Sequence, residues 1–176
     1  MSASHPEIAV VMGNEYDMLV MQDAAKVLDQ FGVQYEIDIL FTHQDPERMI
    51  NFAKSALTRK LKVIIAGASG AAHLPGVIAA YTPLPVIGVP IKAEYSIDGL
   101  DAVYSILQMP PGVPVATMAL NGARNSAIFA LQILGVIHDS YFELVSAYKN
   151  KIKGDAGRTA TQLSNLGYER FVAQIK

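Results

Sequence analysis

The chain has 176 residues, of which 51% are hydrophobic and 17% are charged, and its formal net charge is -2. This length suits one domain with a single core, and the scarcity of charge suggests that another subunit covers part of the surface. The nearly neutral charge argues against nucleic-acid binding, and the absence of cysteine excludes disulfides and thiolate chemistry.

The first part of the chain predicts two pairs of strand and helix. The run at 8–12 is apolar without alternation, which is typical of a strand covered on both faces. Asp17 can cap the helix that follows, and Gly32 ends it. The expected elements are a strand at 8–12, a helix at 20–31, a strand at 35–40 and a helix at 45–56.

The middle of the chain continues this alternation in short, apolar pieces. We expect strands at 63–66, 86–89 and 113–119 and helices at 74–80, 100–107 and 123–136. Residues 63–91 contain no Asp, Glu, Lys or Arg and are long enough to span a bilayer, but four prolines and four glycines divide them. We therefore expect buried strands and a buried helix there, and no association with a membrane.

The alternation indicates a three-layer αβα arrangement, with helices on both faces of a parallel sheet. A flavodoxin-like, doubly wound α/β fold is expected over residues 1–138, with ligands at the carboxyl ends of the strands. Residues 139–176 are expected to form a C-terminal helical extension, interrupted at 154–157 and packed on its own domain or on a neighbour. The first seven residues lack a basic stretch before an apolar one, so we expect no secretory signal and a cytoplasmic protein.

Two histidines fall in loops that follow strands, where the sheet places a ligand site. His43 lies in the loop 41–46, and His73 lies in the run 67–74, whose small residues let a ligand approach the backbone. A lone loop histidine is more often a surface or capping residue than a catalyst, but two at strand ends of one sheet make an acid–base role about as plausible as a surface role. Neither metal-ligand spacing nor a Gly-x-x-x-x-Gly-Lys loop is present, so neither a metal nor a nucleotide cofactor is expected.

Several blocks of the sequence resemble one enzyme family. They are Val10-Val-Met-Gly13 with Asp17, Thr42-His43 followed by Asp45-Pro46, and the runs 63–76, 84–90, 99–110 and 112–117. Over residues 8–134 the chain is similar to the PurE-type N5-carboxyaminoimidazole ribonucleotide mutases and aminoimidazole ribonucleotide carboxylases. The resemblance implies an enzyme of purine biosynthesis that forms homo-octamers with sites between neighbouring chains, and that uses no metal, cofactor or covalent intermediate.

The resemblance also implies roles for residues in three loops. The family moves a carboxylate from the exocyclic nitrogen of an aminoimidazole to ring carbon C4 by decarboxylation and recarboxylation. The residue matching His43 relays the proton, the run matching 67–73 lines the CO2 pocket, and the residue matching Asp17 holds the ribose. The candidate catalytic residues are His43 and His73. The candidate substrate-binding residues are Gly13, Asn14, Tyr16, Asp17, Phe41, Gln44, Ala68, Ser69, Gly70 and Leu74.

The substrate loops depart from the family pattern where the family holds the substrate phosphate. Tyr16, Phe41 and Gln44 stand in place of two serines and an arginine. A phosphate dianion favours a cation and hydrogen-bond donors, so the ribonucleotide should bind weakly unless Arg124 or Lys92 compensates.

Three functions therefore stay open. The first is the ordinary mutase acting on the heterocyclic ribonucleotide. The second is a diverged carboxylase or decarboxylase acting on an unphosphorylated nucleoside or an otherwise altered heterocycle. The third is a non-catalytic protein of the same fold, and the presence of both His43 and His73 argues against it.

Overall fold

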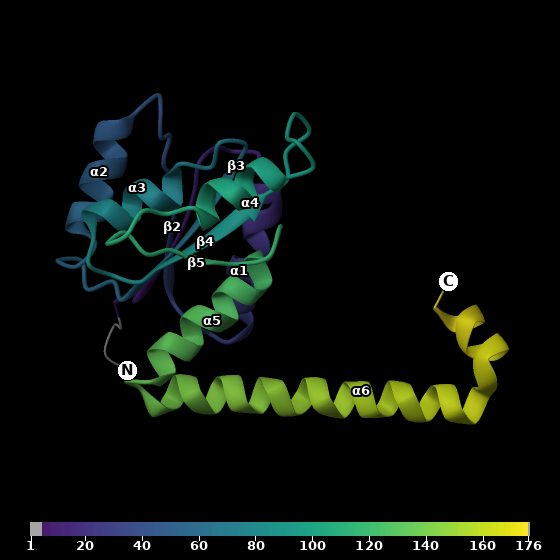
Figure 1. Cartoon of the computed structure of the whole chain (residues 1–176). Coiled ribbons are helices and arrows are strands. Elements are labelled where there is room, and N and C mark those ends of the chain that lie inside the picture. Colours follow the sequence, from purple (N-terminus) through teal and green to yellow (C-terminus); the bar gives the residue numbers. More distant parts are fainter. Residues whose placement is uncertain (1–4, 176) are drawn as a thin grey trace.

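Strands and helices alternate along the chain as far as α5 in the computed structural model, which describes residues 5–175 (Figure 1). The elements are β1 (Ile8–Met12), α1 (Met18–Gln30), β2 (Tyr35–Ile39), α2 (Pro46–Ser55), β3 (Val63–Ser69), α3 (Leu74–Tyr81), β4 (Val86–Ile91), α4 (Leu100–Leu107), β5 (Ala116–Thr117), α5 (Ala123–Gly135) and α6 (Asp139–Gln174). The first four residues of the predicted domain and the last residue of the predicted extension lie outside the described range.

The five strands form one parallel sheet in the order β2-β1-β3-β4-β5. Val10 of β1 pairs with Ile37 of β2 on one side and with Ile65 of β3 on the other. The chain thus runs from β1 to β2 at one edge of the sheet, crosses back over β1 to β3, and continues through β4 to β5 at the other edge. This change of direction makes the fold doubly wound. The predicted flavodoxin-like α/β fold is confirmed, and the order of the strands reverses between β1 and β3.

The sheet is the middle of three layers, and each of its faces makes an apolar core. Alternate residues of a strand point to opposite faces. Ile8 and Val10 join the core beneath α1 and α5, whereas Ala9 and Val11 join the core beneath α2, α3 and α4. Since a strand covered on both faces needs an apolar residue at every position, β1 shows no polar alternation and is fully buried.

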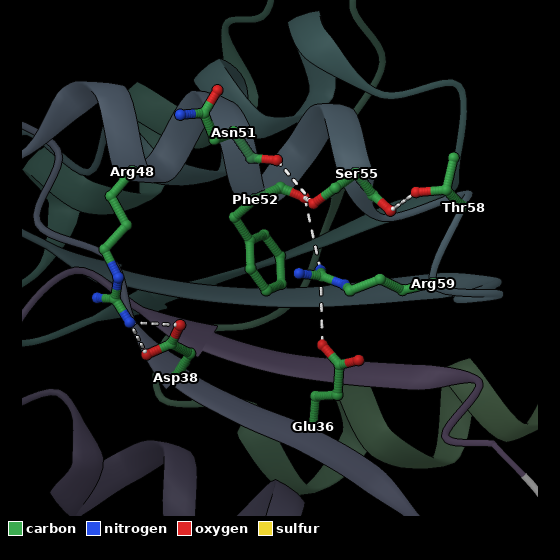
Figure 2. Close-up of polar contacts among 8 residues, drawn as sticks. All are labelled: Glu36, Asp38, Arg48, Asn51, Phe52, Ser55, Thr58 and Arg59. Atoms are coloured by element: carbon green, nitrogen blue, oxygen red, sulfur yellow. Dashed lines mark hydrogen bonds and ion pairs between the residues drawn. The ribbon is translucent and has the colours of Figure 1, made fainter.

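The edge strand β2 carries its acidic residues on the face that α2 covers (Figure 2). Nη2 of Arg48 donates to both carboxylate oxygens of Asp38 at 2.8 Å. The guanidinium of Arg59 lies over the ring of Phe52, and its Nη2 lies 3.5 Å from a carboxylate oxygen of Glu36. Half-exposed pairs of this kind contribute little to the free energy of unfolding, but they fix the position of α2 against the edge of the sheet.

The strand predicted at 113–119 is reduced to β5, which has two residues. Pro114 has no N–H to donate to a neighbouring strand. The N–H of Val113 donates to the carbonyl of Pro110 within a turn, so it is not free for the sheet either. The predicted extent of this strand is therefore wrong.

Helix α6 extends away from the three layers, as Figure 1 shows. Its first turns pack against α5, while apolar side chains farther along, such as Ile152 and Leu163, are exposed. The predicted interruption at 154–157 is wrong, because these residues are helical and the helix breaks at Gly167, with φ 71° and ψ 164°. Glycine inside an exposed helix costs only about 1 kcal/mol relative to alanine, too little to interrupt so long a helix. Within residues 5–175, no helix combines the length and apolarity needed to cross a bilayer.

Gly88, in the middle of β4, has no room for a side chain. A Cβ there would lie 2.5 Å from Cγ2 of Ile106 and 2.8 Å from Cγ1 of Val115, and both atoms belong to stiff β-branched side chains. We expect Gly88→Ala to lower the free energy of unfolding by about 1–3 kcal/mol in chemical denaturation. Gly157→Ala is the control: nothing lies within 4 Å of its new methyl group, so it should raise stability by up to about 1 kcal/mol. Unchanged stability of Gly88→Ala would contradict the packing of α4 on β4.

Candidate functional site

The loops that follow β1, β2 and β3 line one pocket of about 550 Å³ at the carboxyl edge of the sheet. The pocket lies beside the reversal of strand order between β1 and β3, which is where open α/β sheets bind ligands. The structure brings together all twelve residues that the sequence nominated: Gly13, Asn14, Tyr16, Asp17, Phe41, His43, Gln44, Ala68, Ser69, Gly70, His73 and Leu74.

His43 and His73 meet in this pocket. Nδ1 of His73 lies 3.3 Å from Nε2 of His43, so that one ring donates and the other accepts, according to their tautomers. The ring centroids are 5.2 Å apart, and the ring planes are almost perpendicular, at 88°. His43 comes from the loop after β2, and His73 immediately precedes α3. Two imidazoles joined in this way can share a proton and pass it to or from a bound molecule near neutral pH.

Asn14 organises the loop after β1. Its side-chain oxygen accepts from the backbone N–H groups of Tyr16, at 2.9 Å, and Asp17, at 3.1 Å. Its side-chain nitrogen donates to the carboxylate of Asp17 at 3.0 Å and to the hydroxyl of Ser69 at 3.3 Å. Because Ser69 is the last residue of β3, Asn14 ties together the two loops on either side of the strand reversal.

Asp17 is a buried carboxylate, with only 2% of its surface exposed. Burial raises its pKa above the ordinary value, and hydrogen bonds from Ser69, Asn14 and Gly13 oppose part of this rise. Asp17 directly precedes α1, but its side chain does not cap that helix, so the predicted capping role is wrong. The carboxylate instead accepts from Asn14 and lines the pocket.

Aromatic side chains make up much of the pocket wall. Tyr16, Phe41 and Tyr95 line it, and the two tyrosines are about three-quarters exposed, at 75% and 76%. The hydroxyl of Tyr95 lies 3.5 Å from that of Ser69. A Cβ on Gly70 would lie 3.3 Å from the Tyr95 ring, and the φ of +61° at this position also favours glycine. The ring therefore lies close over the small-residue loop.

Five of the described lining residues were not among the nominated site residues: Glu15, Thr42, Ala71, Ala72 and Tyr95, although Ala71 and Ala72 belong to the run expected to line the pocket. The first four lie within the predicted loops, beside nominated residues. Tyr95 comes from the loop after β4, which no motif marks, although the rule that ligands lie at the carboxyl ends of the strands also applies to this loop.

Acid–base chemistry is what this set of groups supports best. Nowhere in residues 5–175 do three His, Asp or Glu side chains gather closely enough to hold a metal ion. The pocket contains the histidine pair, the buried carboxylate of Asp17, and a loop of small residues. Such a site can orient a small polar molecule and move a proton on it.

Comparison with known proteins shows one family. Residues 7–155 match the family described as AIR carboxylase. An N5-carboxyaminoimidazole ribonucleotide mutase of Thermotoga maritima is 46% identical, over 96% of this chain and 98% of its own length. One of Pyrococcus horikoshii is 46% identical, over 99% of this chain and 98% of its own length. The crystal structure of Treponema denticola PurE has a TM-score of 0.77 and 24% identity over 93% of this chain and 99% of that chain, which supports the fold alone.

Asp17→Asn should stabilise the protein at neutral pH. Because burial raises the pKa of Asp17 above 3.8, the folded chain binds this proton more tightly than the unfolded chain does. The contribution of Asp17 to the free energy of unfolding is therefore fully present below pH 3.8, and it is lost as the pH rises through the raised pKa of the folded chain. We therefore expect calorimetry to show a higher Tm at pH 7 for Asp17→Asn, and a smaller loss of stability between about pH 4 and pH 7.

The control for this change is Asp38→Asn, which removes the ion pair with Arg48 and no buried charge. It should leave Tm at pH 7 unchanged or slightly lower, because an ion pair of this exposure is worth at most about 1 kcal/mol. A lower Tm for Asp17→Asn than for the unmodified protein at pH 7 would contradict the account of Asp17.

Proposed function

The chain belongs to the AIR carboxylase family, and we propose that it is an enzyme of purine biosynthesis that moves a carboxylate group on an aminoimidazole ribonucleotide. The family match includes both histidine loops, and the relatives named as mutases align over nearly their whole length. The observation that carries the proposal is the His43–His73 pair, 3.3 Å apart in a pocket at the strand reversal.

The proposed reaction is an isomerisation, so atoms and charge balance within one molecule. The bond between the exocyclic nitrogen and the carboxylate carbon breaks, CO2 forms, and the nitrogen takes up a proton. Ring carbon C4 then attacks CO2, and C4 loses its proton. Since one proton moves from C4 to the nitrogen, one group that both gives and accepts a proton serves both steps. His43 has this role in the proposal, and His73 shares its proton through their hydrogen bond.

The loop between β3 and α3 is suited to holding CO2 and the carboxylate. Ala68 near the end of β3 and Gly70, Ala71 and Ala72 after it have small side chains or none, so a bound molecule can approach their backbone. Gly70 and Ala72 both have left-handed φ values, of 61° and 45°. The N–H of Ala72 donates to the carbonyl of Ser69 at 3.2 Å, and other backbone N–H groups in such a turn can bind carboxylate oxygens.

We also propose that the chain forms a homo-octamer in the cytoplasm, with sites completed between neighbouring chains, as the family resemblance implies. The high proportion of hydrophobic residues, 51%, supports association. So does α6, where Phe142 and Tyr168 are 63% and 73% exposed. Large apolar side chains exposed along a helix favour contact with another copy of the chain.

His43→Asn tests the acid–base role. Asparagine keeps a polar side chain of similar size but cannot transfer a proton at neutral pH, so we expect kcat to fall by about 10²–10⁴-fold. The measurement is an absorbance assay with carboxyaminoimidazole ribonucleotide. The control is His138→Asn, because His138 contacts Glu7 at 3.3 Å and does not line the pocket. Its activity should stay near that of the unmodified protein.

Retention of full activity by His43→Asn would remove His43 from the proposed mechanism. Loss of activity in both variants would point to misfolding, which circular dichroism detects. If His43→Asn left every biological effect of the protein intact, the protein would act as a non-catalytic member of the family.

The octamer predicts a particle of eight times the 19.0 kDa of one chain in static light scattering. Removal of residues 152–176 should reduce this mass, because it deletes the exposed apolar residues of the outer part of α6. A full-length protein that stays monomeric at micromolar concentration would contradict the proposed assembly.

A further inference from the structure

Among residues 5–175, the wall of the pocket carries carboxylates but no ammonium or guanidinium group. None of its lining residues within 5–175 is Lys or Arg, while Glu15 and Asp17 both contribute carboxylates. A phosphate monoester carries nearly two negative charges at neutral pH, and proteins bind it most strongly through Arg, Lys or free backbone N–H groups. The pocket therefore lacks the most common means of holding a phosphate.

Two cations that lie close to these loops in the sequence, Arg48 and Lys92, are each paired with a carboxylate. Arg48 is only four residues from Gln44, but its guanidinium is bound to both carboxylate oxygens of Asp38 (Figure 2). Lys92 lines an adjoining pocket of about 380 Å³ together with Glu94, and its Nζ donates to Asp98 at 2.9 Å.

Arg124 does not supply the missing charge either. It lies on α5, where Nη2 donates to the hydroxyl of Tyr148 at 3.1 Å, and it does not line the pocket. The two cations that the sequence suggested as substitutes, Lys92 and Arg124, are thus both absent from the wall of the histidine pocket.

Two of the helices that begin at the pocket, α1 and α2, have also used N–H groups of the kind that commonly bind phosphate. The start of α3 has no side-chain cap, and it belongs to the loop proposed to hold CO2 and the carboxylate. Before α1, the side chain of Asn14 accepts from the N–H groups of Tyr16 and Asp17. At the start of α2, the carboxylate of Asp45 accepts from the N–H of Arg48 at 3.1 Å. An incoming phosphate would have to displace these bonds or bind beside them, near two carboxylates.

We infer that this site recognises the heterocycle and ribose of its substrate, and that a 5′-phosphate adds little to recognition, so that ribonucleoside and ribonucleotide are turned over with similar efficiency. This inference rests on the proposed carboxylate transfer and specifies the class of molecule that the same site takes. Tyr16, Phe41 and Tyr95 offer aromatic surface for a planar ring. Asp17 offers a carboxylate, held in place by Asn14, that suits sugar hydroxyls better than an anion.

Gln44 is the position at which this property can be reversed. It is exposed, lines the pocket and directly follows His43, so a longer cationic side chain there would add a positive charge beside the reacting groups. One charge-assisted hydrogen bond to phosphate is worth about 10–150-fold in affinity. Gln44→Arg should therefore favour the ribonucleotide over the ribonucleoside.

The experiment compares kcat/KM for carboxyaminoimidazole ribonucleotide and for its dephosphorylated ribonucleoside, with the full-length assembled protein. We expect the two values to differ by less than about tenfold in the unmodified protein, and Gln44→Arg to raise the ratio of nucleotide to nucleoside by about tenfold or more. The matched control is Gln30→Arg, which makes the same change in charge at an exposed position at the end of α1, far from the pocket. Its ratio should equal that of the unmodified protein.

A preference for the nucleotide above about 100-fold in the unmodified protein would overturn this inference, because it would require a strong phosphate site, such as one completed by a second copy of the chain. In that case the proposed carboxylate transfer would stand. Turnover of neither compound by a folded, assembled protein would overturn the proposed function, and with it this inference.

Discussion

Strand β1 is fully buried and pairs with β2 on one side and β3 on the other. The layers on either side of the sheet depend on this burial. A backbone without access to water must pair all its polar groups, and the ladders to β2 and β3 do this along the whole of β1. Both faces then have to be apolar, which requires helices on both sides and leaves polar and reactive groups only at the strand ends. The position of the pocket follows from this burial, since the three loops that line most of it leave the sheet at one edge.

In the loop after β1, the chain satisfies its own polar groups before any ligand arrives. Asn14 uses both ends of its amide, and it holds Asp17 in a buried position where ionisation is disfavoured. Natural proteins commonly tolerate such a cost where a site needs a preformed arrangement. A loop held by internal hydrogen bonds keeps its shape without ligand, so little ordering is needed on binding.

The fold and the loops of the site could be predicted from the sequence because they depend on local pattern. Unbroken apolar runs marked the buried strands. The rule that ligands bind at the carboxyl ends of parallel strands selected the loops that meet in space, and these loops carry His43 and His73, which are 30 residues apart. Tyr95 was missed because its place over Gly70 depends on how the loop after β4 folds back, which no periodicity records. The break assigned to 154–157 failed because Gly154 and Gly157 keep a helical backbone at a cost of only about 1 kcal/mol each, whereas Gly167 adopts a left-handed φ, which ends the helix.

The two edges of the sheet differ from its centre in a way that matters at high protein concentration. On β2, Nη1 of Arg48 donates to the carbonyl oxygen of Ile39 at 2.7 Å. The carboxylates of Glu36 and Asp38 add charged groups beside this edge. The opposite edge, β5, is only two residues long. An open, apolar edge strand can template the addition of a strand from another molecule, and this is a common start of fibrous aggregation. Despite its apolar composition, the chain thus offers little for intermolecular strand pairing, and contact between copies falls to the helices.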